Sequence, residues 1–267
     1  MAKYVEFIGV SGVGKSTTYR YLFKNYKTSL PWIPYEELCK DQYHHTNSFK
    51  NFLEYRLYKL YKPNHIPRIP HNQESLNKFV NQNREFLENF WNTMYNCKED
   101  VNLRFYKTNY IRDIIEKIQN VKDSAYKKYC IIDEGLIHNL NYFINPRIPP
   151  TETEVERLLN LIELPDGIVY FKGEIDNIMS RTMNRGSLRA GEKNLSSEDL
   201  VLKKTQSIKE KSLFIDCIKK SQIPILTVHA QDSISTKADK IMEFLSTLHE
   251  KTTSAKSLEN KSTPFVK

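Results

Sequence analysis

Glycine is scarce in this chain, and long apolar runs are missing from it. Only 8 of the 267 residues are glycine, and three of these lie within Gly9–Ser16. No run of about 18 apolar residues occurs, so the sequence predicts no transmembrane helix. The first nine residues lack the charged and small-residue regions of a signal peptide. They are typical of a first β-strand, and we expect a cytoplasmic protein.

Cysteine is also sparse, and the four cysteines are scattered without a C-x-x-C pair. That spacing indicates neither a zinc site nor a disulfide framework, and reduced thiols are expected in the cytosol. The formal net charge of +8 favours acidic partners such as nucleotides or phosphorylated metabolites. The basic residues are spread along the chain, and no nucleic-acid-binding motif accompanies them. A nucleic acid is therefore not the expected partner.

Short apolar runs alternate with amphipathic segments along the chain. Strands are predicted over residues 4–10, 32–35, 129–133, 167–172 and 224–228. Helices are predicted over residues 15–25, 44–61, 76–91, 103–118, 153–164, 175–183, 197–218 and 235–248. Thr153 is the predicted N-cap of its helix, with Glu156 at capping-box spacing. Parallel strands need crossover helices, so the sequence predicts an α/β fold, a three-layer α/β/α sandwich with a mainly parallel sheet.

The chain length suits one sizeable domain, which we place at residues 1–250. Within it, residues of about 41–122 form a predicted helical insertion, which includes a proline-rich break over 63–70. Residues of about 181–196 form a predicted arginine-rich lid. Residues 251–267 are rich in Lys, Ser and Thr and are predicted to be a disordered tail.

The strongest motif is the octapeptide Gly9–Ser16, which satisfies G-x-x-x-x-G-K-[ST] at every fixed position. It lies between a predicted strand and a predicted helix, as this phosphate-binding loop (P-loop) requires. Lys15 is expected to reach the β- and γ-phosphates, and Ser16 to hold Mg²⁺. Backbone groups are expected to surround the phosphates, and they come from Gly9, Ser11, Gly12, Val13, Gly14 and Thr17. The motif predicts a P-loop NTPase that binds ATP with Mg²⁺.

A second acidic site follows the predicted strand 129–133, which ends in Asp133 and Glu134. Ligands bind at the carboxyl ends of parallel strands, and the P-loop leaves its own strand at that edge. Asp133 is therefore the candidate acid that acts on Mg²⁺, directly or through water. Glu134 is a candidate to share that role or to contact the substrate.

Three arginines, Arg181, Arg185 and Arg189, follow one another at four-residue spacing. On a helix this spacing places them on one face. The planar guanidinium binds phosphate oxygens and stays charged, and phosphoryl transfer needs such charge stabilisation. Gly186 and Gly191 fit a segment that opens and closes. A solvated basic helix face is the alternative interpretation.

Taken in order, these pieces resemble the thymidylate kinase and deoxynucleoside kinase group of P-loop kinases. The P-loop, the acidic strand end, Leu164–Lys172 with the arginines after it, and Pro224–Ile234 each have a similar counterpart there. The resemblance covers about residues 3–25 and 127–248. It implies an ATP-dependent kinase, and analogy with related folds suggests a homodimer.

The resemblance also implies roles for individual residues. Arg181 would lie near the adenine or its phosphates, and Arg185 and Arg189 would surround the transferred phosphate. Glu36 or Glu37 falls where deoxynucleoside kinases carry the carboxylate that activates the acceptor hydroxyl. Three residues would border the base: Ala230, Gln231 and Asp232.

One departure from the group concerns the acidic strand end, which has Glu134 where the group has arginine. A carboxylate there would repel a monophosphate, which favours an uncharged or cationic acceptor such as a nucleoside, sugar or similar polyol. The expected function is a small-molecule kinase in which one carboxylate deprotonates the acceptor; the candidates are Glu36, Glu37, Asp133 and Glu134. A polynucleotide kinase and a nucleotide-dependent ATPase or switch protein are the alternatives.

Overall fold

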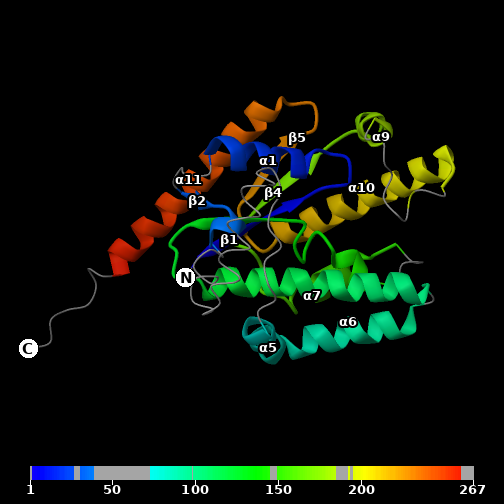
Figure 1. The fold of residues 1–267 in the computed structure, drawn as a ribbon, viewed down its shortest axis with the longest axis horizontal. Helices are drawn as coiled ribbons and strands as arrows, with labels where there is room; N and C mark the ends of the chain where they lie inside the picture. Colours follow the sequence, from blue (N-terminus) through cyan, green and yellow to red (C-terminus); the bar gives the residue numbers. More distant parts are fainter. Residues whose placement is uncertain are drawn as a thin grey trace, which may run out of the picture.

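A computed structural model describes residues 2–26, 31–38, 73–97, 99–144, 149–184, 192 and 195–259. At its centre is a five-stranded sheet in the order β2-β3-β1-β4-β5, with every pair of neighbours parallel (Figure 1). The strands are β1 (Lys3–Ile8), β2 (Trp32–Ile33), β3 (Tyr129–Asp133), β4 (Gly167–Lys172) and β5 (Ile225–His229). The predicted α/β fold with a parallel sheet is confirmed.

The sheet order creates a topological switch point beside β1, where successive connections turn to opposite sides of that strand. After β1 the chain runs past β3 to β2, and after β3 it crosses β1 to reach β4. Phe7 of β1 lies opposite Asp133 at the end of β3. The segments that follow β1 and β3 therefore leave the same edge of the sheet side by side, where ligands bind in folds of this kind.

Two layers of helices cover the sheet, because successive side chains of a strand point to opposite faces. Val5 and Phe7 join the core with the helices of one face, whereas Tyr4 and Ile8 join the core of the other face. The first face is covered by α1 (Lys15–Tyr26) and α11 (Ile234–Glu259). The second is covered by α7 (Val101–Asp123), α8 (Glu152–Leu159) and α10 (Ser197–Lys219). The three-layer prediction is confirmed.

The predicted helix over residues 76–91 is wrong in one respect, because it is two helices, α5 (Gln73–Gln82) and α6 (Arg84–Asn96). Asn83 separates them with a φ of −127°. Its side-chain amide donates to the carbonyl of Phe79 at 3.0 Å, and such local bonds compete with the helix ladder. α5 packs against α7, and α6 packs through Phe86 and Phe90 against Phe143 of the 3₁₀ turn η1 (Leu140–Phe143). Figure 1 shows α5 and α6 beside α7.

Three predicted boundaries are corrected: the end of the second strand and both ends of α8. The second strand stops at Ile33, because Pro34 lacks an N–H for the ladder and α2 (Tyr35–Leu38) begins directly after it. Thr153 is not the N-cap of α8; Thr151 is, and its hydroxyl accepts from the backbone N–H of Glu154 at 3.3 Å. α8 itself ends at Leu159, earlier than predicted.

The C-terminal prediction is also corrected, because α11 continues through Lys251 to Glu259. The disordered tail predicted from residue 251 is therefore helical over its first nine residues. The predicted helix 44–61 and the proline break 63–70 lie outside the described residues. Among the residues that are described, no helix is long and apolar enough to cross a membrane.

Candidate functional site

The P-loop curls tightly between β1 and α1, and glycine is required at two of its positions. Gly9 and Gly12 have φ values of +152° and +103°. A Cβ on Gly9 would lie 2.7 Å from the carbonyl oxygen of Phe171, and one on Gly12 would lie 2.8 Å from the hydroxyl of Thr182. Only glycine combines these angles with so close an approach. The loop is thereby pressed against β4 and α9 (Ile175–Met183).

Lys15 is the first residue of α1, and its side chain is 3% exposed. Its ammonium donates to the carbonyl oxygens of Gly9 at 2.6 Å and Val10 at 3.4 Å. It also forms an ion pair with Glu134 Oε1 at 3.2 Å. A buried ammonium needs such partners, and here they hold it at the start of the loop and toward the end of β3.

Ser16 and Asp133 join the P-loop to the neighbouring strand. The Ser16 hydroxyl donates to Asp133 Oδ2 at 2.7 Å. Asp133 Oδ1 is buried and has no hydrogen-bond partner among the described residues. Burial raises the pKa of this carboxyl; Lys15 lowers it and Glu134 raises it further.

The Ser16–Asp133 pair fits a magnesium ion. Mg²⁺ prefers hard oxygen ligands, keeps several waters and takes only one or two carboxylates from the protein. A hydroxyl and a carboxylate, one of whose oxygens lacks a partner, meet that description. Within the described residues no group of three or more His, Cys, Asp or Glu side chains could hold a metal, so a magnesium ion here would depend on waters and phosphate oxygens for its other ligands.

Glu134 occupies a strained backbone position at the start of the turn after β3. Its φ is +65°, in the left-handed region that non-glycine residues seldom adopt. Asn139 donates its side-chain amide to the Glu134 carbonyl oxygen at 3.1 Å. Tyr110 of α7 donates its hydroxyl to Glu134 Oε2 at 3.0 Å. These contacts aim the carboxylate at Lys15 and place the ring of Tyr110 beside it.

A buried acid and a buried base form hydrogen bonds with the backbone of the turn that follows Glu134. Glu6 of β1 is 0% exposed and accepts from the backbone N–H groups of His138 at 2.6 Å and Ile137 at 3.3 Å. Lys211 of α10 donates to the carbonyl oxygen of His138. Burial raises the pKa of Glu6 to about 7 and lowers that of Lys211 to about 8. Gly135 lies directly against this acid: a Cβ there would lie 2.6 Å from the Glu6 carboxylate, which would have to shift.

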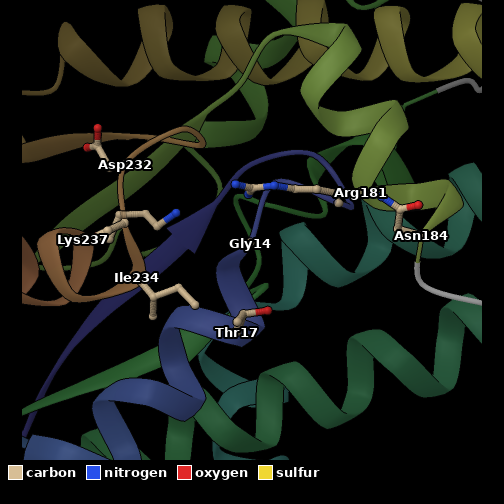
Figure 2. Close-up of a pocket in the computed structure, with 9 residues that line it drawn as sticks. Gly14, Thr17, Arg181, Asn184, Asp232, Ile234 and Lys237 are labelled. Carbon is tan, nitrogen blue, oxygen red and sulfur yellow. The ribbon is translucent and has the colours of Figure 1, made fainter.

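At the other end of the P-loop, two cations share one carbonyl oxygen. Arg181 of α9 donates to the carbonyl of Val13 at 3.1 Å and to that of Ala230 at 2.6 Å. Lys237 of α11 donates to the same Ala230 carbonyl at 3.1 Å. Figure 2 shows the two side chains reaching toward each other beside Gly14.

These cations line an open cavity of about 500 Å³ next to the P-loop (Figure 2). Its lining residues are Gly12, Gly14, Thr17, Arg181, Asn184, Asp232, Ser233, Ile234 and Lys237. Pockets of this size suit a small flat ligand. The cavity joins the end of the P-loop to Arg181, which was expected near the adenine or its phosphates, and to Asp232, which was expected to border the base.

The structure brings together some predicted site residues and leaves others apart. Asp232 lines the cavity, Ala230 bounds it through its carbonyl, and Gln231 is exposed in the turn between them without belonging to the lining. Glu36 and Glu37 lie on α2, directly after β2, and only their backbone is described. Arg185 and Arg189 lie outside the described residues.

Several charged side chains around the site escaped the sequence analysis, among them Glu6, Lys211 and Lys237. Glu6 interrupts an apolar strand, and a charge in such a run is a signal of a buried polar contact. Lys211 and Lys237 sit in amphipathic helices where lysine is ordinary, so nothing local distinguishes them. Both are almost fully buried and donate to backbone carbonyls of functional turns.

Comparisons with known proteins find similarity in structure but not in sequence. No family model matches the chain, and no curated protein matches its sequence. Among solved structures, the chain is similar to deoxyadenosine kinase from M. mycoides with bound dATP. The two share 15% identity and a TM-score of 0.42, over 91% of this chain and 99% of that chain.

The chain's own architecture defines its class. A parallel sheet in the order β2-β3-β1-β4-β5 carries a P-loop after the central strand and a carboxylate at the end of the adjacent one. This is the P-loop NTPase fold, with three α/β/α layers, and it is the fold class that the sequence predicted.

Proposed function

We propose that this protein is a kinase that transfers the γ-phosphate of ATP, with Mg²⁺, to a hydroxyl group of a small uncharged acceptor such as a nucleoside or sugar. The observation that carries the proposal is the meeting of three groups at one sheet edge: Lys15, the Ser16–Asp133 pair and Glu134. Together they supply a phosphate-binding ammonium, a magnesium site and a further carboxylate within one contact network.

The triphosphate is oriented by the difference between the two ends of the loop. The base would occupy the cavity beside Gly14, against Arg181 and Lys237. The γ-phosphate would then lie toward Lys15, as the motif requires. Mg²⁺, when bound at Ser16 and Asp133, neutralises charge on the phosphate oxygens.

Glu134 gains a chemical role when the phosphates arrive. In the structure its carboxylate is paired with Lys15. A triphosphate attracts the same ammonium, so Glu134 is released to accept a proton from an acceptor hydroxyl. Glu36, Glu37 and Asp133 are the other candidates for this general base, and positioning of the base and acceptor supplies much of the rate.

The acceptor's chemistry is indicated by the aromatic side chains beside Glu134. The rings of Tyr106 and Tyr110 are stacked with centroids 6.0 Å apart and planes at 8°. Tyr142 meets Tyr110 edge-on at 6.2 Å. Tyr106 is 59% exposed. The ring that contacts Glu134 is Tyr110, and the exposed ring of Tyr106 stacks on it. This arrangement suits a ring-containing acceptor without a phosphate of its own.

Phosphate transfer from γ-labelled ATP to pooled acceptors tests the proposal. The pools are nucleosides, nucleotides, sugars, aminoglycosides and oligonucleotides, each with Mg²⁺. Lys15→Ala is the inactive reference, and Lys219→Met, which removes an exposed lysine on α10, is the matched control. We expect a labelled nucleoside or sugar with the wild type and the control only. Label in oligonucleotides would instead indicate a polynucleotide kinase, and equal release of free phosphate without acceptors would indicate an ATPase.

A further inference from the structure

A second lysine reaches the P-loop from α10. Lys204 is 2% exposed, and its ammonium lies 2.5 Å from Glu192 Oε1. The same ammonium lies 3.5 Å from the carbonyl oxygen of Ser11, the third residue of the loop. Glu192 is itself only 6% exposed. Lys204 therefore brings a buried, paired charge into contact with the loop that binds phosphate.

The order of the cations along the loop identifies the end at which Lys204 lies. Lys15 contacts the carbonyls of Gly9 and Val10, and Lys204 contacts the carbonyl of the next residue, Ser11. Arg181 contacts Val13, at the end beside the cavity. Because Lys15 marks the β- and γ-phosphates, Lys204 lies at the γ-phosphate end.

Stability alone does not account for this buried pair. Two apolar side chains of similar volume often stabilise a protein as well as a buried ion pair does, because both charges lose their hydration. The ammonium also makes a contact of 3.5 Å with Ser11, at the outer limit of a hydrogen bond. A weak contact of that kind is easily exchanged for a charged oxygen, whose hydrogen bond with an ammonium is shorter and stronger.

We propose that Lys204 is a γ-phosphate ligand, held in place by Glu192 both before and after a triphosphate binds. On binding, the ammonium exchanges the Ser11 carbonyl for a γ-phosphate oxygen and keeps Glu192 as its orienting partner. Lys15 and Lys204 then hold the terminal phosphate from two sides. This inference rests on the proposed nucleotide binding, and it gives the protein a means to distinguish a triphosphate from a diphosphate.

The test compares two nucleotides by isothermal titration calorimetry with Mg²⁺: β,γ-methylene-ATP, which carries a γ-phosphate, and ADP, which does not. For Lys204→Met we expect the triphosphate analogue to bind about 10- to 100-fold more weakly. ADP affinity should change by less than about twofold, because no γ-phosphate is present. Lys204→Arg keeps the positive charge and should restore most of the difference.

Lys203→Met is the matched control, because it removes a neighbouring lysine whose side chain is exposed. It should leave the ratio of the two affinities unchanged. Equal weakening of both nucleotides by Lys204→Met would overturn the proposal and make Lys204 a structural support of the loop, as would no change in either. Circular dichroism of each variant identifies unfolding. If Lys204→Met unfolds, Lys204→Gln, which removes the charge but keeps a polar side chain of similar length, takes its place with the same supporting and contradicting outcomes.

Nucleotide binding by the wild type distinguishes failure of the proposed kinase from failure of the Lys204 contact. If it binds neither nucleotide, the proposed kinase and the Lys204 contact fail together. If it binds both and Lys204→Met leaves their ratio unchanged, only the Lys204 contact fails.

Discussion

The two ends of the P-loop differ in how their positive charges are balanced. At the phosphate end, Lys15 is paired with Glu134 and Lys204 with Glu192. At the base end, Arg181 and Lys237 share the carbonyl of Ala230. Burial lowers the pKa of Lys237, and Arg181 lowers it further.

This difference has a consequence for binding. At the phosphate end carboxylates already neutralise both lysines, and a nucleotide must compete with Glu134 for Lys15. At the base end no carboxylate is bonded to Arg181 among the described contacts, and Asp232 is paired with Lys240. An anionic or acceptor-rich ligand relieves the repulsion between the two cations there. For the proposed kinase we therefore expect the phosphate end to discriminate nucleotides by their charge, and the base end to contribute affinity for all of them.

The largest effect is expected at Lys15. Lys15→Ala removes the ammonium that the motif assigns to the β- and γ-phosphates. We expect transfer from ATP to fall by about 10³-fold, since single donors to developing charge contribute on that order. Steady-state rates with the acceptor found in the pooled assay measure this. Activity within about tenfold of the wild type would contradict the P-loop assignment.

Asp133 tests the metal site at the same end. Asp133→Asn keeps the hydrogen bond from Ser16 possible but removes the negative charge, and we expect a loss of about 10- to 100-fold that added Mg²⁺ partly recovers. Rates measured across a Mg²⁺ series show this. Asp216→Asn, at an exposed ion pair on α10, is the control. An unchanged Mg²⁺ dependence in Asp133→Asn would assign the ion to other ligands.

Glu6 tests the buried support behind Glu134. Its pKa rises from 4.5 to about 7 on folding, so the folded state binds the proton more tightly and stability falls as pH rises through that window. The pKa of Lys211 drops from 10.5 to about 8, so stability rises again between those values. Glu6→Gln should remove this fall in the free energy of unfolding, which is on the order of 3 kcal/mol.

Urea unfolding at a series of pH values measures this profile. Ser212→Ala, beside Lys211 on the same helix, keeps both charges and should retain the fall. A wild type whose stability is flat between pH 4.5 and 7 would show that Glu6 is ionised without penalty. Because the unfolding is measured without nucleotide, either outcome describes the ionisation of Glu6 independently of nucleotide binding.

Arg181 sharpens the contrast between the ends. Arg181→Met removes a cation from the base end, and we expect ATP and ADP to bind about 10-fold more weakly and to the same extent. Calorimetry with both nucleotides distinguishes this from the selective loss expected for Lys204→Met. If Arg181→Met weakened the triphosphate alone, Arg181 would belong to the phosphate end.

The sequence predicted that the P-loop and Asp133 meet at one edge of the sheet, because the signals for both are local. Their roles in binding phosphate and Mg²⁺ stay predictions. The loop motif occupies eight consecutive residues, and Asp133 follows an apolar strand directly. The supporting charges were missed because each depends on contacts far along the chain: Glu6 lies 132 residues from His138, and Lys204 lies 193 residues from Ser11. The N-cap prediction for α8 was wrong for a local reason. The segment Thr151-Glu152-Thr153-Glu154 offers two threonines two residues apart, and the helix begins after the first.

The smallest effect is expected at Tyr106, on the acceptor side of the phosphate end. Tyr106→Ala removes the exposed ring that stacks on Tyr110. If the acceptor ring packs there, its KM should rise about 5-fold while the KM for ATP stays constant, since stacking on an aromatic side chain contributes about 1–3 kcal/mol per ring and the lower end applies to an exposed ring. Phe105→Ala, which removes another exposed ring one residue earlier, is the control. A rise in the acceptor's KM in both variants would indicate loss of α7 packing, and no rise in Tyr106→Ala would place the acceptor elsewhere along the sheet edge.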